Sequence, residues 1–338
     1  MNLGPGNQKG VALLITVMTL TLLTALTVEF HRATWQKLLA ADTYKTRGEL
    51  QAIAISGVNI ATALLEKDFV DNNFDSALDD WAAVKTADFE ELFPDGTLVL
   101  TIEDLSGKLP INSLAEQAGR TPPGETNPAL ELQNIFLNLL TSGVFNVEGE
   151  TEAENILDAI IDWIDTDDKE SDFGAESGYY QSLEQPYDCR NAPIQYIEEL
   201  LLIKGISPEL LYGDGEREGL VDYITIYGDD GRININSADR LLIKSFDPTI
   251  GDELLERFDD FRKMPENKEK LSSPNWYTET SGWPGDIVLS NTITTTKSSF
   301  FQIRSTGISE DLSRTIVIDL QRDSDGNLIT RKRIVEQQ

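Results

Sequence analysis

Residues 11–28 of this 338-residue chain read VALLITVMTLTLLTALTV. The stretch contains no charged residue, proline or glycine. At 1.5 Å per residue, a helix of this length would extend about 27 Å, nearly the hydrocarbon thickness of a bilayer. Its five threonines lower the hydropathy, but a threonine hydroxyl can bond within its own helix to the preceding turn. The stretch therefore predicts a transmembrane helix over residues 11–30.

The helical pattern continues beyond the apolar stretch. An apolar stripe at helical spacing runs among charged residues as far as Leu65. One helix from about residue 11 to residue 67 would be roughly 85 Å long. About half of it would then protrude from the membrane.

The remainder of the chain predicts strands at both ends of a helical block. Alternating or β-rich segments occupy residues 97–103, 298–306, 312–320 and 328–335, with a turn at residues 323–327. Helices are expected at 127–142, 153–164, 193–204, 207–213, 217–227, 237–244 and 250–262. We therefore expect an α+β protein in which a long N-terminal helix packs on a small antiparallel sheet and a large helical domain is inserted. The expected parts are a sheet domain from 31–107 and 286–338, and an inserted domain over 108–285.

An internal repeat indicates two related halves in the inserted domain. The sequence GKLPINS at residues 107–113 recurs as GRININS at residues 231–237. In both copies an apolar pair leads into Asn-Ser and then a predicted helix, so Asn or Ser is expected to cap the free N–H groups. A shared capping device without common ancestry is the alternative.

Composition excludes several classes of site. The formal net charge of −30 disfavours binding to nucleic-acid phosphates, so no nucleic-acid partner is expected. The second repeat resembles the start of a helix-hairpin-helix module, but its surroundings are acidic. One histidine, His31, excludes a histidine triad or a multi-histidine zinc site in the remainder of the chain. The lone Cys189 permits no intrachain disulfide and is expected to be a buried thiol.

The densest cluster of carboxylates is DWIDTDDKESDFGAE at residues 162–176. Acids this close repel one another unless solvent or a hard cation neutralises them, and Ca²⁺ takes six to eight oxygen ligands. The loop is not an EF-hand, because Lys169 and Glu170 occupy the positions of a ligand and the turn glycine. A calcium site of another type, a solvated loop and a catalytic carboxylate pair all stay open. The candidate ligands are Asp165, Asp167, Asp168, Asp172 and Glu176.

The N-terminus resembles a type IV prepilin. Residues 1–10, MNLGPGNQKG, form a short leader that ends in glycine and directly precedes the apolar helix. The resemblance implies that a prepilin peptidase cuts between Gly10 and Val11. Two positions depart from the usual pattern, because Val11 stands where the family has phenylalanine and Ile15 where it has glutamate. The minor pseudopilin K of type II secretion systems resembles this chain in lacking that glutamate.

The central region is similar to type II secretion protein K as well. The similarity rests on DAIIDWIDTDD at 158–168, GAESGYY at 174–180 and NAPIQYIEELLLIKGIS at 191–207, in that order. It implies a pilin-like core with a helical insertion that binds calcium, and a structural rather than catalytic role at the tip of a pseudopilus. The implied location is the bacterial inner membrane, crossed once, with the C-terminal domain in the periplasm.

The resemblance also implies a set of partners. They are the minor pseudopilins I and J, other pseudopilins and the prepilin peptidase, with exported proteins or the outer-membrane secretin as further candidates. Two alternatives come from other classes of protein. One is a minor pilin of a type IV pilus or DNA-uptake machine, and the other is a membrane-anchored periplasmic hydrolase that uses the acidic loop.

Overall fold

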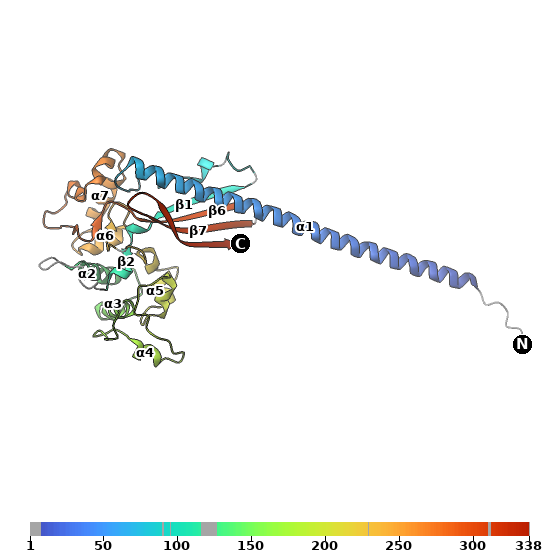
Figure 1. Ribbon diagram of the computed structural model, residues 1–338, viewed down its shortest axis with the longest axis horizontal. Coiled ribbons are helices and arrows are strands. Elements are labelled where there is room, and N and C mark those ends of the chain that lie inside the picture. The colour runs from blue at the N-terminus through green and yellow to red at the C-terminus, as the bar shows by residue number, and fades with distance from the viewer. Residues whose placement is uncertain are drawn as a thin grey trace, which may run out of the picture.

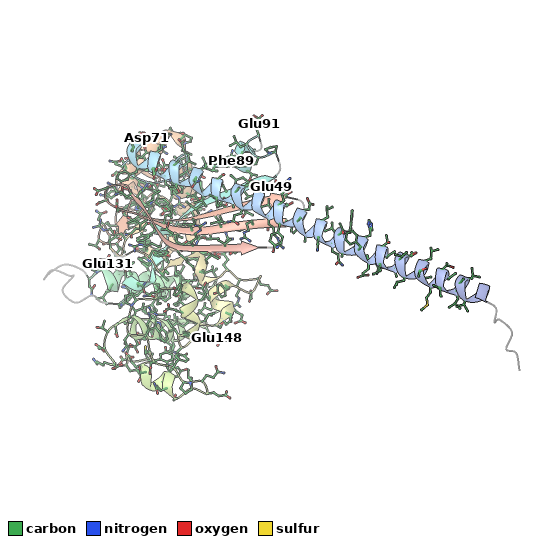
Figure 2. The ribbon with its side chains drawn as sticks, turned by 45° about the vertical axis from the view of Figure 1, so that its right-hand side comes forward. Glu49, Asp71, Phe89, Glu91, Glu131 and Glu148 are labelled. Carbon is green, nitrogen blue, oxygen red and sulfur yellow. The ribbon has the colours of Figure 1, made fainter. Side chains whose placement is uncertain are left out.

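A computed structural model describes residues 8–89, 91–94, 96–115, 127–228, 230–309 and 312–337. Helix α1 (Gln8–Asp71) is continuous over 64 residues, as the sequence predicts. Its N-terminal half extends away from the remainder of the molecule, and the fold is assembled around its C-terminal half (Figure 1). Figure 2 shows Glu49 where α1 reaches the sheet, and Leu50, 1% exposed, is the first core residue of the helix.

The sheet has four antiparallel strands in the order β1-β6-β7-β8. They are β1 (Thr97–Asp104), β6 (Phe300–Ser309), β7 (Leu312–Arg322) and β8 (Leu328–Gln337). One face packs on α1 through a core that includes Leu65, Phe301 and Ile318. The helix lies close to the sheet at Gly57, where a Cβ atom would stand 2.2 Å from Ser305 Oγ. These elements confirm the predicted helix on a small antiparallel sheet.

The inserted domain lies between β1 and β6, beside the end of the sheet that is remote from the N-terminus (Figure 1). Its α-helices are α2 (Pro128–Leu140), α3 (Glu150–Ile164), α4 (Ser177–Gln181), α5 (Pro208–Tyr212), α6 (Arg240–Phe246) and α7 (Asp252–Lys263). The 3₁₀ segments of the chain are η1 (Thr86–Phe89), η2 (Leu105–Gly107), η3 (Ile111–Ser113), η4 (Ile197–Leu202), η5 (Leu220–Asp222), η6 (Pro265–Ser272) and η7 (Trp276–Glu279). One continuous hydrophobic core joins both halves of this domain.

The two repeat copies occupy equivalent places and pack against each other. Strand β2 (Leu109–Pro110) pairs in parallel with β3 (Ile224–Thr225), and β4 (Ile233–Asn234) pairs in parallel with β5 (Thr294–Thr295). A Cβ on Gly107 of the first copy would lie 2.6 Å from Ser237 Oγ of the second. A Cβ on Gly231 would correspondingly contact Ser113 at 3.5 Å. The two copies therefore contact each other reciprocally, and their relatedness stays a prediction.

The repeated asparagines connect loops and do not cap helices, so the predicted capping role is wrong for them. Asn112 donates through Nδ2 to the carbonyls of Ile194 and Ile226. Asn236 donates to the carbonyls of Asp75 and Leu271. The cap of α6 is instead Asp239, whose side chain accepts from the Leu241 N–H. In each copy a two-residue strand, β2 or β4, lies two residues before the asparagine, with one isoleucine between them.

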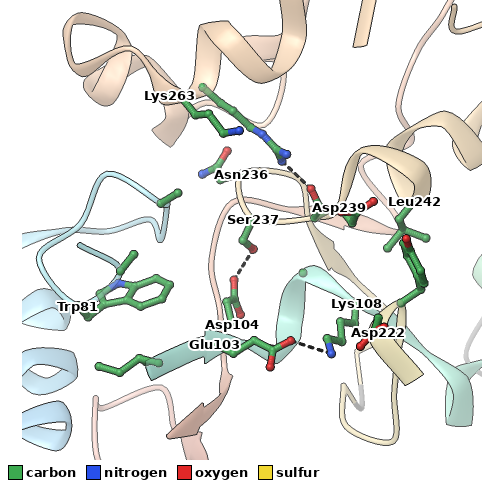
Figure 3. Close-up of a pocket in the computed structure, with 17 residues that line it drawn as sticks. Trp81, Glu103, Asp104, Lys108, Asp222, Asn236, Ser237, Asp239, Leu242 and Lys263 are labelled. Carbon is green, nitrogen blue, oxygen red and sulfur yellow. Dashed lines mark hydrogen bonds and ion pairs between the residues drawn. The ribbon is translucent and has the colours of Figure 1, made fainter. Parts of the chain in front are cut away.

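A buried polar cluster fastens the inserted domain to the sheet domain (Figure 3). Asp104 ends β1, and its Oδ2 accepts from Asn234 and Ser237 of the second repeat and from Ser298, just before β6. We call this cluster, with the adjoining acids Asp68, Asp75 and Asp79 and their partners Arg322 and Lys268, the junction. Because Asp104 and Ser298 lie where the chain leaves and re-enters the sheet, the junction fixes both connections at once.

Two expectations differ from the structure. The predicted helix at 217–227 is wrong, because η5 ends at Asp222 and β3 follows, pairing with a strand more than a hundred residues earlier. The inserted domain was expected to end at residue 285. In the structure residues 286–297 pack with that domain, since Ile287 and Ile293 lie in its core and β5 pairs with β4.

Candidate metal centre

The acidic loop connects α3 to α4 and is closed by a buried carboxylate. Asp162, on the last turn of α3, is fully buried and accepts from the N–H and Oγ of Ser171, at 3.1 and 2.6 Å. Gly174 lies directly against it, because a Cβ at this position would stand 1.9 Å from Asp162 Oδ2. The loop can fold back on the helix only with glycine here. That fold brings Glu176 toward the residues that follow α3.

Asp165, Asp167 and Glu176 form a group whose carboxylate oxygens lie within 4.8 Å of one another. Asp165 caps the C-terminus of α3, and its Oδ1 accepts from the Asp167 N–H at 3.3 Å. Glu176 is 5% exposed, and neither of its carboxylate oxygens has a hydrogen-bond partner among the described residues. A buried carboxylate without partners costs free energy, and a cation bound between the three acids would remove that cost.

The electrostatics of the group favour a cation. Burial, followed by the nearby charges of Asp162 and Asp165, raises the pKa of Glu176 to about 7. Burial also raises the pKa of Asp165, with the charge of Asp167 acting in the same direction. The three carboxylates therefore carry negative charge that no nearby cationic side chain in the described part of the chain neutralises. Oxygen ligands from several carboxylates are the donor set that Ca²⁺ prefers, so these residues fit that ion.

Asn191 joins this site, and sequence reasoning did not select it. Its φ of +48° is the one positive value at a non-glycine residue in the described part of the chain. Its Nδ2 donates to the Asp167 carbonyl and to Asp168 Oδ1, both at 2.9 Å, while its Oδ1 is buried without a partner. An unsatisfied amide oxygen tied to the loop is a further candidate ligand. The signal available in the sequence was Asn191 at the start of the NAPIQYIEELLLIKGIS segment.

The other two predicted ligands lie outside the group. Asp168 is exposed, and one of its oxygens accepts from Asn191. Asp172 is also exposed. Its charge lies near Asp158 and helps to raise the pKa of that carboxyl. The structure thus brings three of the five predicted acids together.

Cys189 is buried beneath the same loop, as predicted for a structural thiol. Its Sγ donates to the Asp162 carbonyl at 3.5 Å, and burial raises the pKa of the thiol to about 12. The thiol is therefore protonated at neutral pH and helps hold the end of α3.

The predicted processing site lies at the start of α1. Gly10 and Val11 are exposed helical residues, whereas residues 1–7 of the expected leader lie outside the described part of the chain. The helix that follows is long and apolar enough to cross a membrane, with a mean hydropathy of 2.3 over its best window and no part of that window buried. Ile15 is 55% exposed within it.

A hollow of about 400 Å³ lies at the junction, and several of its charged groups already have partners. Glu103 pairs with Lys108 at 2.7 Å (Figure 3). Arg262 pairs with Asp259 at 2.6 Å. We assign this hollow a structural role.

The fold defines the class of protein: a pilin-like subunit with an apolar N-terminal helix and a helical domain inserted into its sheet. A solved structure described as the crystal structure of the GspK-GspI-GspJ complex from the enterotoxigenic Escherichia coli type 2 secretion system has the same fold. The match has a TM-score of 0.61 and 15% identity, and covers 88% of this chain and 99% of the other.

Sequence comparisons find similarity to type II secretion system protein K. Residues 107–213 match the family model described as type II secretion system (T2SS), protein K. The chain is 28% identical over 204 residues to a putative type II secretion system protein K of Escherichia coli K12, and 27% identical over 208 residues to type II secretion system protein K of Aeromonas hydrophila. Each match covers 60% of this chain, and the chain spans about 60% of the length of these relatives. The chain is thus similar to type II secretion system protein K, which agrees with the resemblance seen in the sequence.

Proposed function

We propose that this protein is a minor pseudopilin that caps the pseudopilus of a type II secretion system and starts its assembly. The observation that carries the proposal is the inserted domain, which stands beside the end of the sheet remote from the apolar half of α1 (Figure 1). Filament subunits stack through their long helices, and a second subunit above this one would meet the insertion. The role is structural, and the filament would move folded proteins through the outer membrane.

The apolar half of α1 would anchor the chain in the inner membrane, with the folded domains in the periplasm. Assembly would follow cleavage by a prepilin peptidase between Gly10 and Val11. Because Ile15 stands at the position of the usual glutamate, the membrane-spanning part of the helix has no buried carboxylate. A carboxylate in the membrane needs a partner group to neutralise it. Since this helix has no such carboxylate, the subunit does not need a neutralising group from a neighbouring subunit. The proposed neighbours are the minor pseudopilins I and J, because the structural relative was solved in a complex of that composition.

We also propose that Ca²⁺ binds Asp165, Asp167 and Glu176, with Asn191 as a further ligand. The support is the unsatisfied buried oxygens of Glu176 and Asn191. Bound Ca²⁺ would hold the loop between α3 and α4 in one shape and so fix one end of the inserted domain.

Co-expression tests the assembly role. The full chain is produced with the prepilin peptidase and minor pseudopilins I and J of its own host, then extracted in detergent. We expect a complex of the three subunits in which this chain begins at Val11, and we expect Gly10→Ala to retain the leader. Gly48→Ala is the matched control, since a Cβ at either glycine meets nothing within 4 Å. Assembly instead with the minor pilins of a type IV pilus would contradict the proposal.

A further inference from the structure

The two edges of the sheet differ in how they are covered. Strand β1, at one edge, is flanked by η1, whose Phe89 is 8% exposed and joins the core beneath the sheet. Strand β8, at the other edge, pairs with β7 (Figure 1). Within the described ranges, no further helix or strand makes an extended contact with β8. An open edge presents unpaired N–H and C=O groups along its whole length, so β8 is a template for another strand.

The side chains of β8 also lack cover. Ile334 and Val335 are 38% and 43% exposed, and they point to opposite faces of the sheet because they are neighbours on a strand. Natural edge strands are often protected by charge against aggregation, and the basic run from Arg331 to Arg333 could serve that purpose alone. Protection of the edge against aggregation does not explain why aliphatic side chains are exposed on both faces of β8. A strand added beside β8 would bury both.

The basic run has free charges in a strongly acidic protein. No ion pair or hydrogen bond to a side chain is found for Lys332 or Arg333 among the residues that the structure describes. Asp319 lies directly opposite Lys332 on β7, but its two oxygens already accept from Gln302 and Tyr227, each at 2.9 Å. A second copy of β8 would bring like charges together, whereas an acidic strand would neutralise them.

A groove lies between this end of the sheet and the inserted domain, and residues of β6 and β7 line it together with those of β8. The pairing of β7 and β8 shifts between Asp319 and Leu320, and the residue skipped on β8 is Arg331. At this point a groove of about 460 Å³ is lined by Arg331 and Lys332 on one side and by residues 193–196 of the inserted domain on the other. Tyr196 is 55% exposed at its rim. A partner strand longer than the regular part of β8 would reach this groove.

We propose that β8 binds an extended acidic segment of another protein by β-strand addition. Carboxylates of that segment lie opposite Lys332 and Arg333, and aliphatic side chains lie opposite Ile334 and Val335. Main-chain hydrogen bonds supply affinity, and the alternating side chains supply selectivity. The strand accepts its partner whether or not Ca²⁺ occupies the acidic loop.

Synthetic peptides test this with the full chain in detergent. The first probe is a ten-residue fluorescent peptide with two valines followed by two glutamates at its centre, the order that places the glutamates opposite Lys332 and Arg333 when the peptide runs antiparallel to β8. The second has proline in place of one central valine, and the third has two lysines in place of the glutamates. Fluorescence anisotropy should show binding of the first peptide, at least tenfold weaker binding of the proline peptide, and weaker binding still of the lysine peptide. Proline removes an N–H from the ladder without changing the charge.

The second part of this experiment reverses the charge of β8 in the protein. Lys332→Glu combined with Arg333→Glu should reverse the preference between the acidic and the lysine peptide, while the exposed Arg240→Glu on α6 of the inserted domain should leave it within twofold. Equal binding of the acidic and proline peptides would overturn strand addition, since it would indicate charge attraction alone. Absence of binding by the acidic peptide would overturn the proposal altogether.

Discussion

The acidic loop and the junction both bury carboxylates, but among the described residues only the junction places cationic side chains beside them. At the junction Asp75 accepts from Arg322 and the Ser298 N–H, and Asp79 pairs with Lys268 at 2.9 Å. In the loop Glu176 is also buried, and it has no hydrogen-bond partner and no cationic partner among the described residues. The difference teaches that a buried acidic cluster indicates a bound cation where the chain supplies no cationic side chain of its own.

The largest expected loss of stability among the tests of this comparison comes from substituting Arg322. Removing it leaves the buried Asp75 and Asp68 without their cation, and breaking a buried ion pair typically costs about 3–5 kcal/mol. Urea unfolding of a fragment from about residue 40 onward measures the loss in Arg322→Ala. Arg304→Ala is the control, because its pair with Glu336 is half exposed and should cost less than about 1 kcal/mol. Equal losses would show that the junction is not a buried electrostatic unit.

Adding Ca²⁺ should stabilise the loop by a somewhat smaller amount. A ligand at a hundred times its dissociation constant stabilises the folded state by about 2.7 kcal/mol, enough to raise the melting temperature by several degrees. Asp165→Asn should remove most of this shift, and Mg²⁺ should produce less of it because it demands tighter octahedral geometry. Junction variants should keep the full calcium shift. A shift lost equally in Asp79→Asn would erase the distinction between the two clusters.

Asp68 is the junction acid with the weakest pairing, and it should make stability depend on pH. Burial raises its pKa from 3.8 to about 7, while its Oδ2 lies 3.6 Å from Arg322 Nη1. Between these pH values the folded protein keeps a proton that the unfolded chain has released. The free energy of unfolding therefore falls as pH rises from about 4 to about 7.

Asp68→Asn should reduce that slope and raise stability above pH 7 relative to the wild type, and Glu176, whose pKa is also raised to about 7, accounts for part of the slope that is left. The exposed neighbour Asp71→Asn is the control and should preserve the slope. Urea unfolding without Ca²⁺ at several pH values checks both. The wild-type slope persisting in Asp68→Asn would assign it to other groups.

The smallest expected effect is at Asp172. The sequence predicts this residue as a ligand, but it lies outside the group formed by Asp165, Asp167 and Glu176. Asp172→Asn should change the calcium-induced shift by less than about 0.5 kcal/mol, as is usual for an exposed substitution. Loss of the whole shift would mean that the loop closes further around the ion.

Local patterns predicted the elements that depend on local sequence. The apolar stripe of α1, the alternation in β6 to β8 and the acid-rich loop are each contained in one stretch of chain. The strand at Ile224–Thr225 was missed because its conformation depends on pairing with Leu109–Pro110. The junction was missed for the same reason, since it joins acids near Asp75 to Arg322 across most of the sequence.

The candidate metal site contains residues of both kinds, some that local sequence predicts and one that depends on a distant contact. Asp165, Asp167 and Glu176 stand close enough in sequence for their carboxylates to be considered together. Asn191 contributes from beyond α4, and only its left-handed backbone and unpaired oxygen reveal it. Asp168 and Asp172 could not be separated from the ligands by sequence, because which acids face inward depends on how Gly174 lets the loop fold onto Asp162.

Direct calorimetric titration of Ca²⁺ tests the central claim, using the wild type, Glu176→Gln and the exposed loop variant Glu170→Gln as the matched control. The wild type and Glu170→Gln should bind Ca²⁺ with equal affinity. Glu176→Gln should bind at least tenfold more weakly, yet be more stable than the wild type without metal at pH 8, because it removes a buried charge that has no partner. Equal binding by all three proteins, or no binding by the wild type, would contradict a calcium site in this loop.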